Sequence, residues 1–331
     1  MAVPRKLCAT CLRPALPHPV KSPPGKAPSV PALPPDIEWA GQSVELLKEL
    51  HILTRDGRLN QDTRRKLKQI EHLARFIEQL IAAITPYGPA LTLADHGAGK
   101  SYLGFILCDR LWRTPGAGGM VYGIETRPEL VERSRQLAAR LGFAQMRFLN
   151  IAAADAARAE ELPERIDLVT ALHACDTATD DAIAFGLDKQ AQAMALVPCC
   201  QAEVAACLRQ SKALQLARTP LAELWRRPLH TREIGSQLTN VLRCLYLESQ
   251  GYQVTVTELV GWEHSLKNEL ILAHRTGHAK HSAGQRLRAL LAEFGLQTLL
   301  PRRYPRLAAK DDGAFGPERP FCARVGVAGL A

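Results

Sequence analysis

The sequence predicts an α/β protein with a doubly wound, mostly parallel sheet, an antiparallel hairpin at one edge and a helical segment before the first strand. Short apolar runs alternate with amphipathic segments of helical period between residue 91 and about residue 200, as in repeated βαβ units. The first apolar run breaks into a glycine-rich turn that leads directly into a helix. Two further strand patterns with a short connection lie nearer the C-terminus, which predicts the hairpin.

Composition and charge limit the class of protein. The 331 residues are 47% hydrophobic and 23% charged, which is enough to bury a substantial core. We expect a cytoplasmic protein that does not enter a membrane, because the sequence has neither a signal peptide pattern nor a run of about 18 apolar residues. The nine cysteines are an odd number and are expected to be reduced thiols. The net charge of +9 favours a polyanionic partner.

Residues 1–36 are expected to form a disordered tail. They contain ten prolines and cannot bury enough apolar area to offset the entropy of ordering. Cys8 and Cys11 have the spacing of half a zinc site, with His18 as a possible third ligand. Because tetrahedral zinc takes four ligands and no clear fourth follows, two thiols in a mobile arm remain the alternative.

Residues 37–90 are expected to form a helical cap. Apolar residues recur at three- and four-residue spacing from Ser43 to Ile84, which is typical of amphipathic helices. Asp56 and Gly57 separate two such helices.

Residues 91–276 are expected to form the ligand-binding domain. Its parallel strands are predicted at 91–95, 120–124, 146–149, 166–172 and 193–197, and its helices at 102–112, 128–141 and 179–187. A further helix at about 231–249 precedes the hairpin strands at 252–259 and 269–274. The insertion at 201–230 lies where a substrate lid is expected, and residues 277–331 form a basic C-terminal extension with a last helix at 284–294.

The glycine-rich turn permits two interpretations. Residues 94–101 satisfy a relaxed P-loop pattern, in which Lys100 would bind phosphate and Ser101 would bind magnesium. That interpretation requires an acidic residue at the end of another strand, but the strand at 166–172 is followed by His173. A P-loop nucleotide hydrolase is therefore the alternative rather than the preferred function.

A nucleoside ligand fits the same turn better. Asp95 ends the first strand, and Gly97 and Gly99 allow the backbone to approach a ligand closely. Glu125 closes the second strand 26 residues after Gly99, where an acid accepts both ribose hydroxyls. Lys100 becomes the first residue of the helix that follows the turn.

Three segments resemble one enzyme family. Residues 95–103 (DHGAGKSYL), 172–176 (LHACD) and 197–200 (VPCC) together are similar to class I S-adenosylmethionine (SAM) dependent methyltransferases of the "methyltransferase domain 32" branch. The resemblance covers about 64–275 and implies a Rossmann-like core with SAM as cofactor. It implies that Asp95, Gly97, Gly99 and Lys100 border the methionine end of SAM, that Glu125 holds the ribose, and that residues 150–152 flank the adenine, with Asn150 and Ile151 as the binding residues. Two departures are Ser101 in place of the third glycine and the lack of an acid directly after Asn150.

In this fold the segments after the fourth and fifth strands border the transferred methyl group. They carry the candidate catalytic residues His173, Cys175, Asp176, Cys199 and Cys200. His173 has the intrinsic pKa of a general base and Asp176 is placed to orient it, although a strand-capping His173 is equally compatible with the sequence. The cysteines permit a thiolate nucleophile or, together with His173, a metal site, but packing at crowded strand ends explains them more simply.

RNA is the preferred methyl acceptor, with a protein or a small molecule as alternatives. The insertion at 201–230 places Trp225 beside Arg226 and Arg227, and an aromatic side chain next to arginines can stack a base and bind a phosphate. Basic segments at 51–75 and 275–310 add positive charge, although solvated helix faces would have the same composition.

Overall fold

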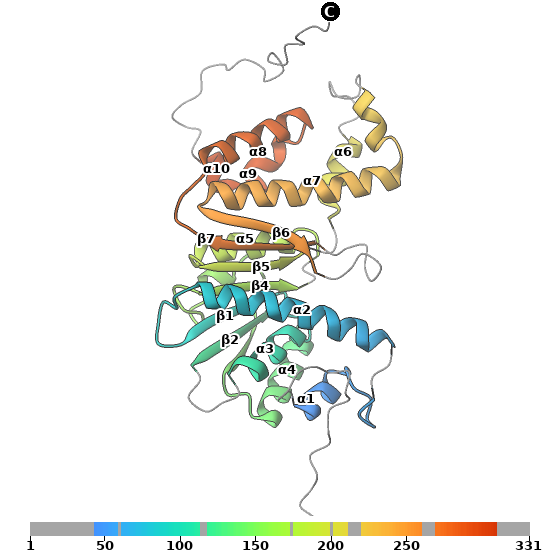
Figure 1. Ribbon diagram of the computed structural model, residues 1–331. Helices are drawn as coiled ribbons and strands as arrows, with labels where there is room; N and C mark the ends of the chain where they lie inside the picture. Colours follow the sequence, from blue (N-terminus) through green and yellow to red (C-terminus); the bar gives the residue numbers. More distant parts are fainter. Residues whose placement is uncertain are drawn as a thin grey trace, which may run out of the picture.

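The computed structural model describes residues 43–58, 61–112, 118–172, 175–198, 201–210, 220–259 and 269–309. Cys8, Cys11 and His18 of the predicted tail lie outside these ranges. Within them the strands form one sheet in the order β3-β2-β1-β4-β5-β7-β6 (Figure 1). The strands are β1 (Leu91–His96), β2 (Gly119–Glu125), β3 (Met146–Asn150), β4 (Leu168–Leu172), β5 (Ala193–Val197), β6 (Tyr252–Glu258) and β7 (Glu269–Arg275).

The strand directions confirm the predicted fold class. β1 to β5 pair in parallel, whereas β7 is antiparallel to both β5 and β6. Every residue of β5 is buried, as expected for a strand covered on both faces, while β6 at the sheet edge exposes part of its length. The strand order reverses at β1, between β2 and β4, and the carboxyl ends at such a switch point form the usual ligand crevice.

Helices cover both faces of the sheet. The main helices are α1 (Val44–Glu49), α2 (Gln61–Ala83), α3 (Tyr102–Leu111), α4 (Pro128–Leu141), α5 (Ala178–Asp188), α6 (Glu203–Gln210), α7 (Pro228–Ser249) and α8 (His281–Glu293). Short helical segments follow at η1 (Ala156–Arg158), η3 (Pro220–Trp225), η4 (Gln297–Leu299), α9 (Leu300–Arg303) and α10 (Pro305–Ala308). Buried side chains of α1 to α4 form one core cluster, and those of α5 to α8 form another with the opposite face of the sheet.

The helix bounds follow local signals in the sequence. α4 begins with Pro128 and ends at Gly142, whose φ of 75° is the left-handed conformation that glycine adopts readily. α7 begins three residues earlier than the pattern predicts because Pro228 occupies its first turn. β4 begins two residues later than predicted. Asp167, just before it, is held by the segment around β1: its carboxylate accepts hydrogen bonds from the backbone N–H groups of Tyr87 and Thr92, both at 2.8 Å.

The C-terminal helices pack against α7 and do not stand apart from the domain. Leu287, Leu291 and Leu307 are buried in the same core cluster as α7. Figure 1 shows α8 to α10 lying together with α7, beyond the β6–β7 hairpin. Within the described ranges no helix is both long enough and apolar enough to cross a lipid bilayer.

Candidate active site

The glycine-rich turn after β1 is bound to the end of β2. Gly97 and Gly99 have φ values of 70° and 58°, and Ser101 also has a positive φ of 52°. The N–H of Ala98 donates to the Ile124 carbonyl at 3.0 Å, and the N–H of Gly99 donates to Glu125 Oε2 at 2.8 Å. The turn and the carboxylate at the end of the neighbouring strand therefore form one unit.

Glu125 is buried and held as an anion. Its side chain is 7% exposed, and burial alone would raise its pKa. Hydrogen bonds from the Arg127 side chain, from the Arg127 N–H and from the Gly99 N–H outweigh that effect and lower the pKa of Glu125 from 4.5 to about 2. The carboxylate is therefore ionised at neutral pH, and its two oxygens accept hydrogen bonds from Gly99, Thr126 and Arg127.

The space above the turn fits a nucleoside cofactor such as SAM. A Cβ atom at Gly97 would contact no heavy atom within 4 Å, so that side of the turn is open. A Cβ atom at Gly99 would lie 3.7 Å from Arg127 Nη2 and 4.0 Å from Glu125 Oε2. A side chain at Gly99 would therefore fill space beside the carboxylate.

The same hydrogen bonds disfavour the P-loop interpretation. A P-loop directs its backbone N–H groups at phosphate oxygens, whereas Ala98 and Gly99 donate to protein acceptors and Ser101 N–H donates to the Ala98 carbonyl at 2.7 Å. The Glu125 carboxylate would repel a phosphate placed at this turn. Ser101 is fully buried and cannot reach a magnesium ion.

Asp95 lies beneath the turn and is almost completely buried. Its Oδ1 accepts a hydrogen bond from the Thr170 hydroxyl on β4 at 2.9 Å. Burial is the largest influence on this carboxyl group and raises its pKa from 3.8 to about 7, despite the opposing hydrogen bond from Thr170. Asp95 is therefore partly protonated at neutral pH, a state that the sequence alone did not suggest.

His96 is a buried polar residue that the sequence analysis missed. Its ring centroid lies 5.5 Å from that of Phe185 on α5, and burial lowers the pKa of His96 from 6.5 to about 4. The imidazole is therefore neutral at physiological pH. Its position directly after Asp95, at the end of an otherwise apolar strand, was the signal available in the sequence.

The predicted adenine-binding residues lie at the end of β3, next to Glu125. Asn150 Nδ2 donates to the carbonyl oxygens of Glu125 and Thr126 at 3.1 and 2.8 Å, which ties the ends of β2 and β3 together. Ile151 is half-buried and packs against the core cluster of α5. The structure thus brings Asn150, Ile151, Glu125 and the glycine turn to one edge of the sheet.

Part of the predicted catalytic edge can be described. Cys175 is an exposed thiol, while His173, Cys199 and Cys200 lie outside the described residues. Asp176 adopts a positive φ of 49°, and its Oδ1 accepts hydrogen bonds from the N–H groups of Ala202 and Glu203 at 2.9 and 3.2 Å. Asp176 therefore caps α6 and joins the segment after β4 to the segment after β5.

A buried arginine supports this junction and was not identified from the sequence. Arg243 on α7 is fully buried, forms an ion pair with Asp180 at 2.6 Å, and donates to the Asp176 carbonyl at 2.7 Å. Its Nη1 also donates to Asn240 Oδ1 at 3.1 Å, and Asn240 donates to Glu269 Oε2 at 2.7 Å. The sequence feature that could have identified Arg243 is the position of an arginine on the core-facing side of an amphipathic helix.

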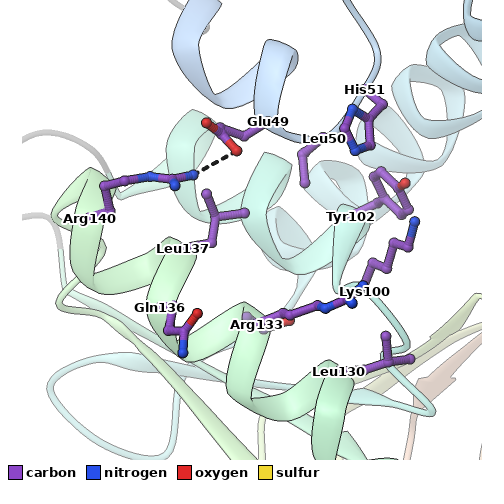
Figure 2. Close-up of a pocket in the computed structure, with 11 residues that line it drawn as sticks. Glu49, Leu50, His51, Lys100, Tyr102, Leu130, Arg133, Gln136, Leu137 and Arg140 are labelled. Atoms are coloured by element: carbon purple, nitrogen blue, oxygen red, sulfur yellow. Dashed lines mark ion pairs between the residues drawn. The ribbon is translucent and has the colours of Figure 1, made fainter.

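Lys100 lies apart from the other predicted cofactor residues. Its side chain lines a pocket of about 250 Å³ between α1 and α4, which is shown in Figure 2. Within the described part of the chain, no group of three His, Cys, Asp or Glu side chains is placed to hold a metal ion.

The strand order is that of a Rossmann-like fold, with a glycine turn and an acidic residue at the ends of adjacent parallel strands. Residues 65–207 match the family model described as "Methyltransferase domain". The resemblance seen in the sequence is thereby confirmed, and the protein is a SAM-dependent methyltransferase.

Several solved structures are similar to this chain at low sequence identity. The magnesium protoporphyrin IX methyltransferase from Synechocystis PCC 6803 with bound SAH (S-adenosylhomocysteine) is 15% identical, with a TM-score of 0.40 over 70% of this chain and 94% of that one. An rRNA methylase from Streptococcus thermophilus is 11% identical, with a TM-score of 0.35 over 62% of this chain and 93% of that one. The CMeT domain of the citrinin polyketide synthase is 14% identical, with a TM-score of 0.41 over 66% and 58% of the respective chains. Among curated proteins, none matches this chain.

Proposed function

We propose that this methyltransferase acts on RNA, with tRNA or rRNA as the acceptor class. The observation that carries the proposal is the net charge of +9, which favours a polyanionic substrate. Arg227 and His230, in the last part of the predicted lid where α7 starts, are both exposed and offer cationic and aromatic contacts. A protein or a small molecule as acceptor is the alternative.

The C-terminal helices contribute less to an RNA surface than their composition suggests. Lys280 and Arg286 both pair with Glu248 on α7, at 2.8 and 3.2 Å. Arg303 pairs with Glu203 at 2.7 Å. Because these cations attach the helices to the domain, we place the RNA surface at the carboxyl edge of the sheet and the lid.

The proposed cofactor contacts follow from the edge formed by β1, β2 and β3. SAM supplies a methyl group on a sulfonium sulfur, which is transferred to an oxygen or nitrogen nucleophile. The Glu125 carboxylate accepts hydrogen bonds from the ribose hydroxyls, and Gly97 and Gly99 allow close approach of the backbone. Asn150 and Ile151 flank the adenine, while Asp95 stays below the turn and fixes its position through Thr170.

The proposed catalytic edge follows β4 and β5. His173 acts as the general base that takes a proton from the methyl acceptor. Because Asp176 already caps α6, we assign it to positioning: it sets the segment that carries His173 and Cys175 against the segment that carries Cys199 and Cys200. The three cysteines border the acceptor, and a covalent role for any of them requires that its serine variant lose turnover.

Transfer of tritiated methyl from labelled SAM tests the acceptor class. The purified protein is incubated with total RNA and with total protein from cells that lack it, so that unmodified acceptor sites are present. We expect label in the RNA fraction and none in protein. Label in protein, or only in small molecules, would refute the RNA assignment while leaving the methyltransferase activity intact.

A His173→Gln variant tests the assignment of the base. Loss of a general base typically lowers turnover by about 100-fold or more, and the pH profile of turnover should lose its ascending limb. Unchanged turnover and an unchanged pH profile in this variant would show that His173 only caps the strand.

A further inference from the structure

A second pocket lies beside the cofactor turn and is separate from Glu125. It has a volume of about 250 Å³ and is bounded by the end of α1, by Lys100 and Tyr102, and by one side of α4 from Leu130 to Arg140 (Figure 2). We call it the cationic pocket. Lys100 directly follows Gly99 of the turn, so the pocket adjoins the proposed cofactor site without sharing its carboxylate.

The charges around the cationic pocket do not balance. Its lining includes Lys100, Arg133 and Arg140 but only one acidic residue, Glu49. Glu49 pairs with Arg140 at 2.6 Å, which leaves the other two cations without an acidic partner among the described residues. Two uncompensated positive charges at one hollow favour an anion that carries more than one negative charge.

The side chains also provide suitable hydrogen-bond donors. Figure 2 shows Arg133 reaching from α4 toward Lys100, whose amino group lies near the rings of Tyr102 and His51. A lysine ammonium group acts as a point charge, and an arginine guanidinium group can bind two oxygens of one oxyanion. Tyr102 and Gln136 add neutral donors to the same lining.

Several other basic side chains in the described part of the chain are paired with acidic residues. Arg110 pairs with Glu78, and Arg306 pairs with Asp188 at 2.6 Å. Arg127, three residues before Leu130 of the pocket lining, pairs with Glu125 at 3.1 Å. Among the described residues, Lys100 and Arg133 share a hollow whose one acidic side chain, Glu49, is paired with Arg140.

We propose that the cationic pocket binds a phosphate group, held by Lys100 and Arg133. This gives Lys100 a role in binding phosphate that does not require a P-loop, because its side chain faces α1 and α4 rather than the backbone of the turn. The inference does not depend on the identity of the methyl acceptor. The phosphate comes either from the backbone of a bound RNA or from a free phosphate or nucleotide, and both sources present the same oxyanion.

Titration of the full-length protein with inorganic phosphate tests the site. Binding is followed by two-dimensional NMR at constant ionic strength, with chloride as the balancing anion, in the wild type, Arg133→Gln and Arg147→Gln. Arg147 is an exposed arginine on β3 outside the pocket and serves as the matched control. We expect phosphate affinity to fall about two- to fivefold in Arg133→Gln, the range for a single exposed ion pair, and to stay unchanged in the control.

A second arm identifies the source of the phosphate. Binding of a single-stranded RNA oligonucleotide is measured over a range of salt concentrations, and loss of one phosphate contact lowers the slope of log K against log salt by about 0.7. A reduced slope in Arg133→Gln assigns the pocket to an RNA phosphate. An unchanged slope with weakened inorganic phosphate binding supports the pocket as a site for a free phosphate or nucleotide.

The proposal is overturned if the wild type does not bind phosphate, or if Arg133→Gln binds it as tightly as the wild type does. Thermal unfolding of each variant confirms that the fold is retained. If the protein does not methylate RNA but still binds phosphate, the proposed acceptor is refuted and the cationic pocket is retained as a phosphate site.

Discussion

Replacing Asp95 by asparagine should stabilise the protein at neutral and alkaline pH. The carboxyl group is 2% exposed and receives one strong hydrogen bond, from Thr170 at 2.9 Å. Burial raises its pKa from 3.8 to about 7, so the folded state binds a proton that the unfolded state has released. Stability from this group therefore decreases as the pH rises from about 4 to about 7, and the full penalty is present above pH 7.

The magnitude follows from the pKa shift. A shift of about three units corresponds to a penalty of roughly 4 kcal/mol above pH 7, at about 1.4 kcal/mol per unit. Asparagine stays neutral at every pH and still offers an oxygen to Thr170. The stability advantage of Asp95→Asn should therefore be small at pH 4 and should grow by about 2.6 kcal/mol between pH 5 and pH 8.

Urea unfolding of the wild type and of Asp95→Asn at pH 5 and pH 8 measures this difference. Asp167→Asn is the matched control, because Asp167 is also buried but accepts hydrogen bonds from Tyr87, Thr92 and Gln192. The amide would place a donor against these donors, so the control should lose about 2 kcal/mol. A stability advantage of Asp95→Asn that does not change with pH, or a loss of stability at pH 8, would refute the reasoning.

Three further predictions concern the turn, the buried arginine and the thiol. Gly99→Ala should lose about 1 kcal/mol of stability and bind SAM about tenfold more weakly. Gly142 has a similar positive φ and open space around it, so Gly142→Ala should lose stability without losing SAM affinity. Calorimetry with SAM distinguishes the two variants. Arg243→Met should lose about 3 to 5 kcal/mol in urea unfolding because Asp180 keeps a buried charge without its partner, and a loss below 1 kcal/mol would contradict this. Cys175→Ser should retain full methyl transfer, because the serine replaces an exposed thiol with a group of similar size, and loss of turnover in a folded variant would point to a thiolate nucleophile.

The fold was predictable because its signals are local. The continuous apolar runs at β4 and β5, the glycine turn after β1 and the proline at the start of α4 each act within a few residues. The glycine spacing together with Glu125 also indicated the cofactor edge. The structure then showed that the two are joined by a hydrogen bond from the Gly99 N–H.

The electrostatic details were not predictable because they depend on residues far apart in the chain. Arg243 and Asp180 are 63 positions apart, and no spacing rule connects them. The raised pKa of Asp95 depends on burial by elements that fold around it. The cationic pocket forms only when α4 places Arg133 in the same lining as Lys100. The basic C-terminal segment suggested an RNA surface, but its cations face acidic residues of α6 and α7.

The central claim is that Glu125 binds the ribose of SAM, and isothermal calorimetry tests it most directly. We expect the wild type to bind SAM and S-adenosylhomocysteine but not magnesium ATP. We expect a loss of SAM affinity of about tenfold or more in Glu125→Gln, since hydrogen bonds to a charged group contribute about 1.5 to 3 kcal/mol, and no loss in the exposed control Glu129→Gln. Equal SAM affinity in Glu125→Gln and the wild type, or binding of magnesium ATP without SAM, would contradict it.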